Sequence, residues 1–255
     1  MINPDIPYNS IALVYDEFGL DEFSIRMIPY IKSILGIKSF RGMKILDLAC
    51  GTGSAALELA NQGADVIAID SSESMLKLAR KKMKASSRKV KFIQADLRTF
   101  EVDGSFDLIL CLFDTLNHFI HINDVRNILT NAGSRLKSSG DLVFDLNTHY
   151  GFRKNWDNWR VVRESDRFYS IWDTVYDTKE RIAEITIRAF SKSKNQLIKA
   201  AEVTVPERAY TSSEVKKTVK SASLNIVEVF ECLSTKPPDA DSPRNVYFCK
   251  RAWGI

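Results

Sequence analysis

A short apolar strand that runs directly into a glycine-rich turn constrains this chain most. In residues 44–56 the apolar run 45–49 precedes Gly51 and Gly53, and a helical pattern follows at once. This order predicts a buried strand that turns sharply into a helix. The glycines let the backbone approach a ligand closely, and the N-terminus of the helix presents free N–H groups to it.

The next predicted strand, residues 65–69, ends at Asp70. A carboxylate at this point accepts hydrogen bonds from the ribose hydroxyls of a nucleoside. The turn and the acid together predict a site for a nucleoside cofactor. Gly51, Gly53 and Ala56 also satisfy a loose G-x-G-x-x-A pattern, so a nicotinamide dinucleotide is an alternative at this point.

The longer string Asp-Leu-Ala-Cys-Gly-Thr-Gly at residues 47–53 resembles motif I of the class I S-adenosylmethionine (SAM) methyltransferases. In that family the loop wraps the amino-acid end of SAM. The resemblance therefore makes Ala49, Gly51 and Gly53 cofactor contacts. It also puts Asp47 beneath the ammonium group of the cofactor.

The segment that begins at Asp70 extends this resemblance. Residues 70–76 match the D-x-S-x-x-M-L pattern of the family, and Ser72 is a good helix N-cap. The resemblance implies cofactor contacts at Ser71 and Met75, with the Met75 thioether against one face of adenine. Ordinary helix packing is the alternative for Met75.

Residues 90–97 form a short predicted strand that ends in an acid. The family has a carboxylate on the adenine amino group here, which implies that role for Asp96. The backbone N–H of Leu97 is the candidate donor to a ring nitrogen. A turn or helix cap is the alternative for Asp96. The following strand, residues 106–112, brings Leu112 to the cofactor by the same resemblance.

The loop at residues 113–119 follows this fourth strand and contains His118. Ligands in parallel sheets bind outside the carboxyl ends of the strands. Histidine is suited to accept a proton near neutral pH, so His118 is the candidate general base. A structural or solvent-exposed histidine is the alternative.

The N-terminal segment resembles the helical cap of amino-sugar and glycine or sarcosine N-methyltransferases. Tyr8, Ala12, Tyr15 and Asp16 match a Y-x-x-x-A-x-x-Y-D pattern. The resemblance puts Tyr15 over the methionine end of SAM, as a cofactor contact and a second catalytic candidate. It pairs Arg26 with the carboxylate of SAM, while a surface helix position is the alternative for Arg26.

These observations and the resemblance predict an α/β fold with a Rossmann-like, seven-stranded, mostly parallel sheet whose last strand is antiparallel. A helical cap is expected at residues 1–43, and the SAM-binding domain at 44–146 and 211–255. Residues 147–210 are expected to insert a small antiparallel sheet after the fifth strand, because β-branched and aromatic residues gather in four stretches. These stretches are residues 160–163, 169–176, 182–190 and 197–205.

The inserted sheet is expected to serve as a lid or as a platform for the methyl acceptor. A dimer surface is the alternative. Its aromatic residues are expected to wall the acceptor pocket opposite Tyr15, and its arginines to hold an acceptor carboxylate or phosphate. The residues in question are Tyr169, Trp172, Tyr176, Tyr210, Arg160, Arg163 and Arg208.

The composition of the chain bears on whether it binds a membrane, a metal ion or a nucleic acid. The formal net charge is +4, and no run of about 18 apolar residues marks a membrane span. Cys50, Cys111, Cys232 and Cys249 have no metal-ligand spacing, so no metal is expected. The N-terminus lacks a basic segment followed by an apolar one, which favours a cytoplasmic protein. The N-P-P-Y signature of adenine N-methyltransferases is absent, and a nucleic-acid partner is disfavoured.

The function expected from the resemblance is SAM-dependent methyl transfer (EC 2.1.1.-) to a small-molecule acceptor, at nitrogen or oxygen. A homodimer is one expected arrangement. An RNA or protein methyltransferase is an alternative, and a SAM-binding protein without methyl-transfer activity is another.

Overall fold

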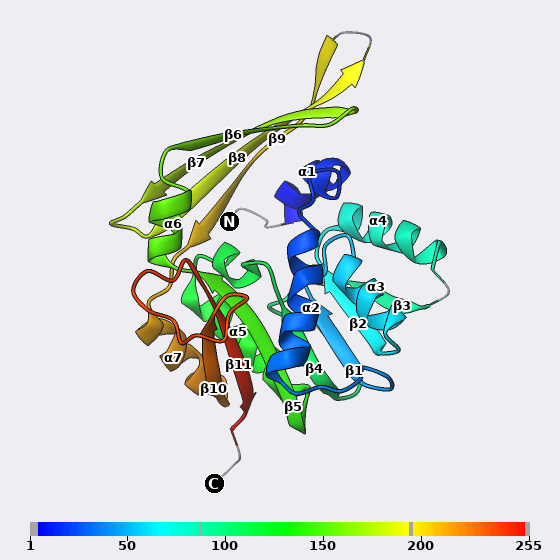
Figure 1. Cartoon of the computed structure of the whole chain (residues 1–255), viewed down its shortest axis with the longest axis vertical. Helices are drawn as coiled ribbons and strands as arrows, with labels where there is room; N and C mark the ends of the chain where they lie inside the picture. The colour runs from blue at the N-terminus through cyan, green and yellow to red at the C-terminus, as the bar shows by residue number, and fades with distance from the viewer. Residues whose placement is uncertain (1–4, 87, 194–195, 253–255) are drawn as a thin grey trace.

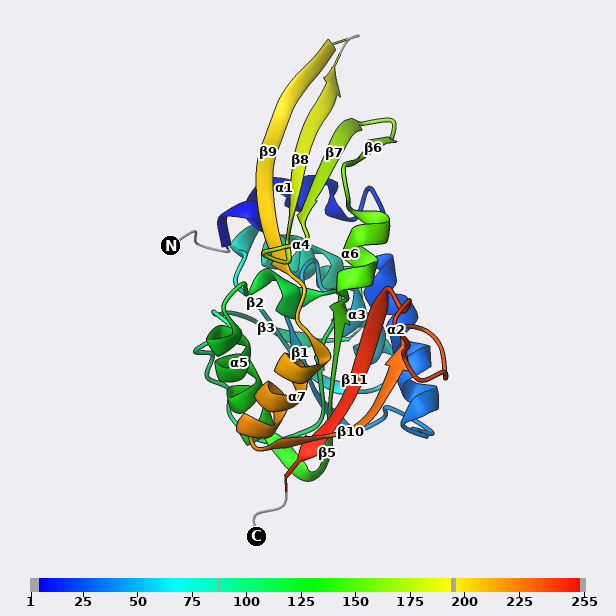
Figure 2. The same ribbon diagram turned by 90° about the vertical axis from the view of Figure 1, so that its left-hand side faces the viewer.

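The computed structural model describes residues 5–86, 88–193 and 196–252, and Figures 1 and 2 show it from two directions. A seven-stranded sheet has the order β10-β11-β5-β4-β1-β2-β3, and a separate four-stranded sheet has the order β6-β7-β8-β9. The predicted fold class is confirmed. The strands are β1 (Lys44–Leu48), β2 (Asp65–Asp70), β3 (Val90–Gln94), β4 (Phe106–Cys111), β5 (Leu136–Asn147), β6 (Trp159–Glu164), β7 (Phe168–Asp177), β8 (Ile182–Ser193), β9 (Gln196–Arg208), β10 (Leu224–Glu231) and β11 (Arg244–Arg251).

Helices cover both faces of the larger sheet. They are α1 (Asp5–Tyr15), α2 (Glu22–Ile34), α3 (Ser54–Asn61), α4 (Glu73–Lys84), the 3-10 turn η1 (Thr115–His118), α5 (Ile122–Ser134), α6 (His149–Asn155) and α7 (Ser212–Ser221). None of the helices in the described ranges is long and apolar enough to cross a membrane.

Strands β1 to β5 run parallel, and β11 lies antiparallel between β5 and β10. Alternation along the strands divides the core in two. Leu46 packs on the face that α5 and α7 cover, while Ile45 packs on the face that α2 and α3 cover. Each fully buried aliphatic side chain of this kind stabilises the fold by about 1.5–3 kcal/mol. From β1 the sheet extends through β2 and β3 on one side and through β4 and β5 on the other, and such sheets bind ligands at the point where the strand order reverses in this way.

Local details differ from the sequence-based expectation. A kink or an interruption is expected at Pro29, but this residue lies inside α2, which continues past it to Ile34. A turn is expected at residues 139–140, but these residues lie within β5. There the register moves from Leu136 opposite Phe106 to Asp141 opposite Leu108, so the extra residues form a bulge. The final strand is expected to reach Trp253, which lies outside the described residues.

The inserted sheet comprises β6 to β9 and stands over the larger sheet, with α1 between them (Figures 1 and 2). Its strands are longer than the four predicted stretches. The hairpin turn between β7 and β8 is closed by the Asp177 carboxylate, which accepts hydrogen bonds from the N–H groups of Lys179 and Glu180. Arg181 takes the positive φ of 58° that a glycine usually supplies in such turns. The division of the chain into a cap, a SAM-binding domain and an insertion, with boundaries at residues 43, 146 and 210, stays a prediction.

Trp172 and Ile187 on the inner face of this sheet pack against Ile11 and Val14 of α1. The insertion and the N-terminal cap therefore share one small core. They lie together at the end of the larger sheet where the loops after β1 and β4 emerge.

Candidate active site

A cavity lies at the carboxyl ends of β1, β2 and β4, with about 910 Å³ of empty space that includes its open mouth. The turn after β1 contributes one wall, and the loop after β4 contributes the other. Its lining includes Tyr8, Tyr15, Ala49, Cys50, Gly51, Thr52, Asp70, Ser71, Met75, Asp96, Leu97, Leu112, Phe113, Thr115 and His118. Most of the expected cofactor contacts and both catalytic candidates therefore meet here.

Gly51 and Gly53 of the turn differ in what surrounds the place where a side chain would lie. A Cβ added at Gly51 would have Tyr15 Cε1 at 3.9 Å as its nearest neighbour and would point into the cavity. A Cβ added at Gly53 would lie 2.8 Å from Ala79 Cβ and 2.9 Å from the Phe92 ring. The absence of a side chain at Gly51 thus leaves the turn open toward the cavity. Packing of the turn against α4 and β3 explains Gly53, which does not line the cavity.

Asp70 holds the turn in place from the end of β2. Its Oδ2 accepts a hydrogen bond from the Gly51 N–H at 2.7 Å, and its Oδ1 accepts one from the Ser72 N–H at 2.8 Å. The Ser72 hydroxyl caps α4 by accepting from the Met75 N–H. This arrangement orients the Asp70 carboxylate and directs Ser71 and Met75 toward the cavity.

Asp96 lines the cavity from the loop after β3. The Arg98 guanidinium donates hydrogen bonds to both carboxylate oxygens of Asp96, and this pairing lowers the pKa of Asp96. The side chain therefore stays ionised and accepts hydrogen bonds over the ordinary pH range. Leu97 and Leu112 line the same cavity with apolar surface.

Two other expected cofactor contacts lie away from this lining. Asp47 is buried in β1, and its Oδ2 has no hydrogen-bond partner within the described part of the chain. Burial, with a smaller effect of Asp70, raises the pKa of Asp47 to about 7. Arg26 is exposed on α2 and does not reach the cavity.

A polar network joins the N-terminal cap to the glycine-rich turn through Lys82 of α4. The Lys82 Nζ lies 2.6 Å from Asp16 Oδ2 and 3.3 Å from Asp21 Oδ2, both on the cap. It also donates to the hydroxyls of Thr52 at 2.9 Å and Ser54 at 2.6 Å. Since Asp16 follows Tyr15, this network holds Tyr15 over the turn.

A second cavity of about 900 Å³ adjoins the first and shares Tyr8, Tyr15, Phe113 and His118 with it. The inserted sheet and α6 provide its other walls. Its lining also includes Asp114, Asn155, Trp156, Trp159, Val161, Arg163, Trp172, Ile185, Ile187, Val205, Glu207 and Arg244.

A buried ionic cluster forms the floor of the second cavity. Arg244 of β11 donates hydrogen bonds to Asp114 Oδ2 at 2.5 Å and to Asp145 Oδ2 at 2.8 Å. Asp145 also accepts hydrogen bonds from the N–H groups of Phe113 and Asp114. These last two residues have positive φ angles of 62° and 50°, so Asp145 stabilises a strained loop after β4.

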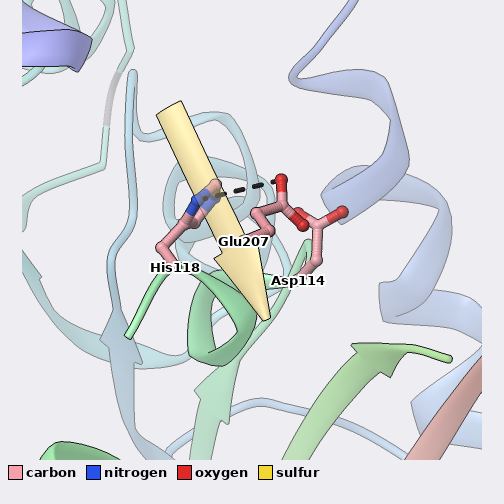
Figure 3. A group of neighbouring side chains, drawn as sticks. All are labelled: Asp114, His118 and Glu207. Carbon is pink, nitrogen blue, oxygen red and sulfur yellow. Dashed lines mark ion pairs between the residues drawn. The ribbon is translucent and has the colours of Figure 1, made fainter. Parts of the chain in front are cut away.

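Glu207 and His118 face each other above this cluster (Figure 3). His118 Nδ1 lies 3.8 Å from Glu207 Oε1, and His118 Nε2 lies 2.8 Å from the Tyr8 hydroxyl. Burial lowers the pKa of His118 and raises the pKa of Glu207 well above its ordinary value. Asp114, His118 and Glu207 each offer a ligand atom within 4.8 Å of the others, a geometry that could hold a metal ion, although no metal is expected from the sequence.

The expected acceptor wall is largely different from the observed one. Of the four aromatic residues, Trp172 alone lines the second cavity. Tyr176 hydrogen-bonds His149, the Tyr210 hydroxyl donates to the Phe119 carbonyl, and Tyr169 contacts Phe190. These three side chains pack the structure around the inserted sheet instead.

The three expected arginines also separate. Arg163 lines the cavity, with its guanidinium 5.1 Å from the centre of the Trp172 ring. Arg160 is 68% exposed and pairs with Asp173, and Arg208 pairs with Glu214. Of these three arginines, only Arg163 lines this cavity, and its Nη1 donates a hydrogen bond to the Phe18 carbonyl at 3.0 Å.

Comparison with known proteins gives consistent matches. Residues 45–140 match the family model described as "Methyltransferase domain". A Bacillus subtilis (strain 168) protein named "Putative methyltransferase YqeM" is 28% identical over 238 residues, covering 93% of this chain and 94% of the relative. The fold is shared with a SAM-dependent methyltransferase from Clostridium acetobutylicum, with a TM-score of 0.82, 24% identity and coverage of 96% and 99%. These matches support the assignment of the chain to the class I SAM-dependent methyltransferases.

This methyltransferase also shares its fold with SAM-bound CalS10, an amino pentose methyltransferase from Micromonospora echinaspora. The TM-score is 0.68 at 19% identity, and the match covers 89% of each chain. The cofactor is SAM. Two features of the methyltransferase fit it: the open backbone at Gly51, and the buried carboxylate of Asp47, which has a free oxygen for a cation.

Proposed function

We propose that this methyltransferase transfers the methyl group of SAM to a nitrogen or oxygen atom of a small molecule held in the second cavity. The observation that carries the proposal is the wall that the two cavities share. Tyr8, Tyr15, Phe113 and His118 line both of them. A cofactor in the first cavity and an acceptor in the second would therefore meet at this wall.

The residues of the first cavity have distinct proposed roles toward SAM, which supplies a methyl group on a sulfonium ion. Asp70 accepts the ribose hydroxyls, and Asp96 and Leu97 hold the adenine edge. Met75 packs on the adenine face. Asp47 stabilises the ammonium group, because a nearby cation favours the ionised form of a buried carboxylate.

The residues at the shared wall align the reacting atoms and exclude water. Alignment is the main requirement for a direct displacement. His118 is neutral at neutral pH because burial lowers its pKa, so it can accept a proton from the acceptor. Burial raises the pKa of Tyr15 well above its ordinary value, so the Tyr15 phenol keeps its proton and orients the ligands.

The inserted sheet favours a small acceptor over RNA or protein. It covers the second cavity together with α1, whereas a polymer needs an open groove. All four cysteines are free thiols, which fits the expected cytoplasmic location.

A screen of methyl acceptors tests this proposal. The protein is incubated with SAM and panels of amines, amino sugars, alcohols and carboxylic acids, and S-adenosylhomocysteine (SAH) is measured by mass spectrometry. We expect SAH formation with members of at least one panel and its loss in His118→Gln. Turnover with RNA or protein alone, or SAM binding without any turnover, would contradict the proposal.

A further inference from the structure

We propose that the acceptor is an amine that binds as its ammonium ion, and that Glu207 is the residue that selects it. This inference rests on the proposed function of the second cavity and names the class of molecule that the cavity takes. Glu207 comes from the last strand of the inserted sheet, so the insertion supplies the selectivity as well as the cover.

Glu207 is a buried carboxylate with little compensation from the protein. Only 2% of the surface of Glu207 is exposed to solvent. Asn147 Nδ2 lies 3.4 Å from Oε2, and His118 Nδ1 lies 3.8 Å from Oε1, which are both long for a charge-stabilising contact. Burying a carboxylate costs free energy unless a cation or several hydrogen bonds balance it. Among the described residues, Glu207 therefore has no close cationic partner to balance a charge on its carboxylate.

The Arg244 guanidinium group near this cavity pairs with residues other than Glu207. Arg244 donates to Asp114 and Asp145, and its third described hydrogen bond goes to Asn147 Oδ1 at 3.0 Å. None of these three hydrogen bonds goes to Glu207, so the guanidinium group is directed to Asp114 and Asp145.

The protonation of Glu207 responds to a cation. Burial raises its pKa, so the protein by itself favours the neutral acid. An ammonium ion beside it stabilises the carboxylate, because an opposite charge within about 4–6 Å favours the ionised form. A neutral alcohol gives no such gain, and an anionic group would face Asp114 and Glu207 together.

The walls above Glu207 suit the body of an amine. Trp156, Trp159 and Trp172 line the cavity with Tyr8 and Tyr15, and Ile185 and Val205 add aliphatic surface. Aromatic faces attract ammonium groups and also bury apolar carbon. An amine attached to a flat or aliphatic ring matches both properties.

A divalent metal ion is the competing occupant of the same place. Asp114, His118 and Glu207 have suitable atoms, but the Asp114 carboxylate already pairs with Arg244 at 2.5 Å. A dication bound there would lie beside this guanidinium. A single positive charge on an ammonium ion meets less repulsion and needs one carboxylate, so the charges favour the amine.

The reaction balances with these groups. The ammonium ion held beside Glu207 gives one proton to the neutral imidazole of His118, and the lone pair that remains on nitrogen forms the new N–C bond. The C–S bond breaks as it forms, and the sulfur keeps the electron pair. The products are the N-methylammonium ion and SAH, and the proton on His118 passes to solvent.

A binding experiment tests the inference without relying on turnover. Protein saturated with SAH is titrated calorimetrically with benzylamine, benzyl alcohol and benzoate, which share one ring and differ in the polar group. We expect benzylamine to bind at least tenfold more tightly than the other two. In Glu207→Gln, benzylamine and benzyl alcohol should bind within twofold of each other.

Glu202→Gln is the matched control, because Glu202 is an exposed acid on the same strand that pairs with Arg188 and Lys199. It should keep the preference for the amine. Equal affinities for amine and alcohol in the unaltered protein overturn the inference, and this comparison needs no variant. Tight binding of Mn²⁺ that Glu207→Gln abolishes, without a preference for amine, overturns it in favour of a metal site.

The acceptor screen separates this inference from the proposed function. Turnover of alcohols or carboxylic acids but not of amines refutes the amine class and leaves methyl transfer intact. Amine-selective binding without any turnover supports the role of Glu207 and refutes methyl transfer.

Discussion

Tyr8 of α1 and His118 of η1 are joined by a hydrogen bond of 2.8 Å between the phenol Oη and the imidazole Nε2. Their rings meet edge to face, with centroids 5.5 Å apart. The N-terminal helix therefore fixes the orientation of a residue that follows the fourth strand of the sheet. Through this contact the cap takes part in the site as well as covering it.

Tyr8→Phe tests this relationship. The substitution keeps the ring and removes the hydrogen bond, so the imidazole of His118 loses its fixed orientation. We expect the maximal rate of methyl transfer to fall about tenfold, because misplacement of a reacting group reduces the rate more than binding. SAH affinity, measured by calorimetry, should stay within about twofold. An unchanged rate would mean that His118 does not depend on Tyr8.

The pH dependence of methyl transfer provides a second test. Burial is the main cause of the lowered pKa of His118, while Asp114 opposes this shift and Arg244 adds to it. Above the lowered pKa the imidazole is neutral and can accept a proton. As the pH falls through it, the imidazole becomes charged and the rate should fall.

We therefore expect an acid-side inflection below the ordinary histidine pKa of about 6.5. Glu207 and Tyr8 also face the ring, so the same profile is measured in His118→Gln. Loss of the inflection assigns it to His118. An inflection that persists in the variant assigns it to another group and contradicts a role for His118 as proton acceptor.

Substitutions of the two glycines of the turn should differ in effect, because one should mainly weaken SAM binding and the other should mainly lower the stability of the fold. Gly51→Ala directs a methyl group into the cofactor cavity, so SAM affinity should fall about tenfold with a loss of stability of about 1 kcal/mol from its positive φ. Gly53→Ala forces a methyl group against Ala79 and Phe92. It should lower the free energy of unfolding by about 2–4 kcal/mol. Urea unfolding and calorimetry on both variants measure the two effects, and equal effects would contradict the distinction.

The sequence predicted the sheet and the turn from strand to helix at Gly51 and Gly53 because both depend on local patterns. The strand that precedes Gly51 adjoins this turn in sequence, and Asp70 ends β2 shortly before α4 begins. Gly53 is an instructive exception. Its spacing in the motif suggested contact with the ligand, but its neighbours Ala79 and Phe92 come from other elements, so its packing role is visible only in the fold.

The floor of the second cavity was not predicted, because long-range packing creates it. Asp114, Asp145, Glu207 and Arg244 come from four segments and match no local motif. The position of Asp114 directly after the fourth strand was a usable signal. Glu207 gave none, because an acid near the end of a strand is ordinarily exposed.

The aromatic residues of the insertion show that the sequence predicts strands better than it predicts which face of a sheet lines a cavity. Alternation along a strand indicates which side chains share a face, but it does not say which face turns toward the cofactor. Trp172 faces α1 and the cavity, whereas Tyr169 does not line it. The strands themselves were predictable from their β-branched and aromatic residues, while the direction of each face depended on how the sheet docks.

Lys82 should control how firmly the cap closes over SAM. Its Nζ joins Asp16 and Asp21 of the cap to Thr52 and Ser54 beside the turn. Lys82→Met keeps the length of the side chain and leaves two acids near each other without their cation. Although these groups are partly exposed and therefore screened, the network links several elements at once.

We expect Lys82→Met to release SAH about five- to tenfold faster in stopped-flow displacement, with an association rate within about twofold, because the cap opens more readily. Raising the salt concentration should speed release from the unaltered protein and have less effect on the variant. Lys81→Met is the control, since Lys81 is exposed on the same helix. If both variants release SAH at the rate of the unaltered protein, the contacts of Lys82 do not hold the cap closed.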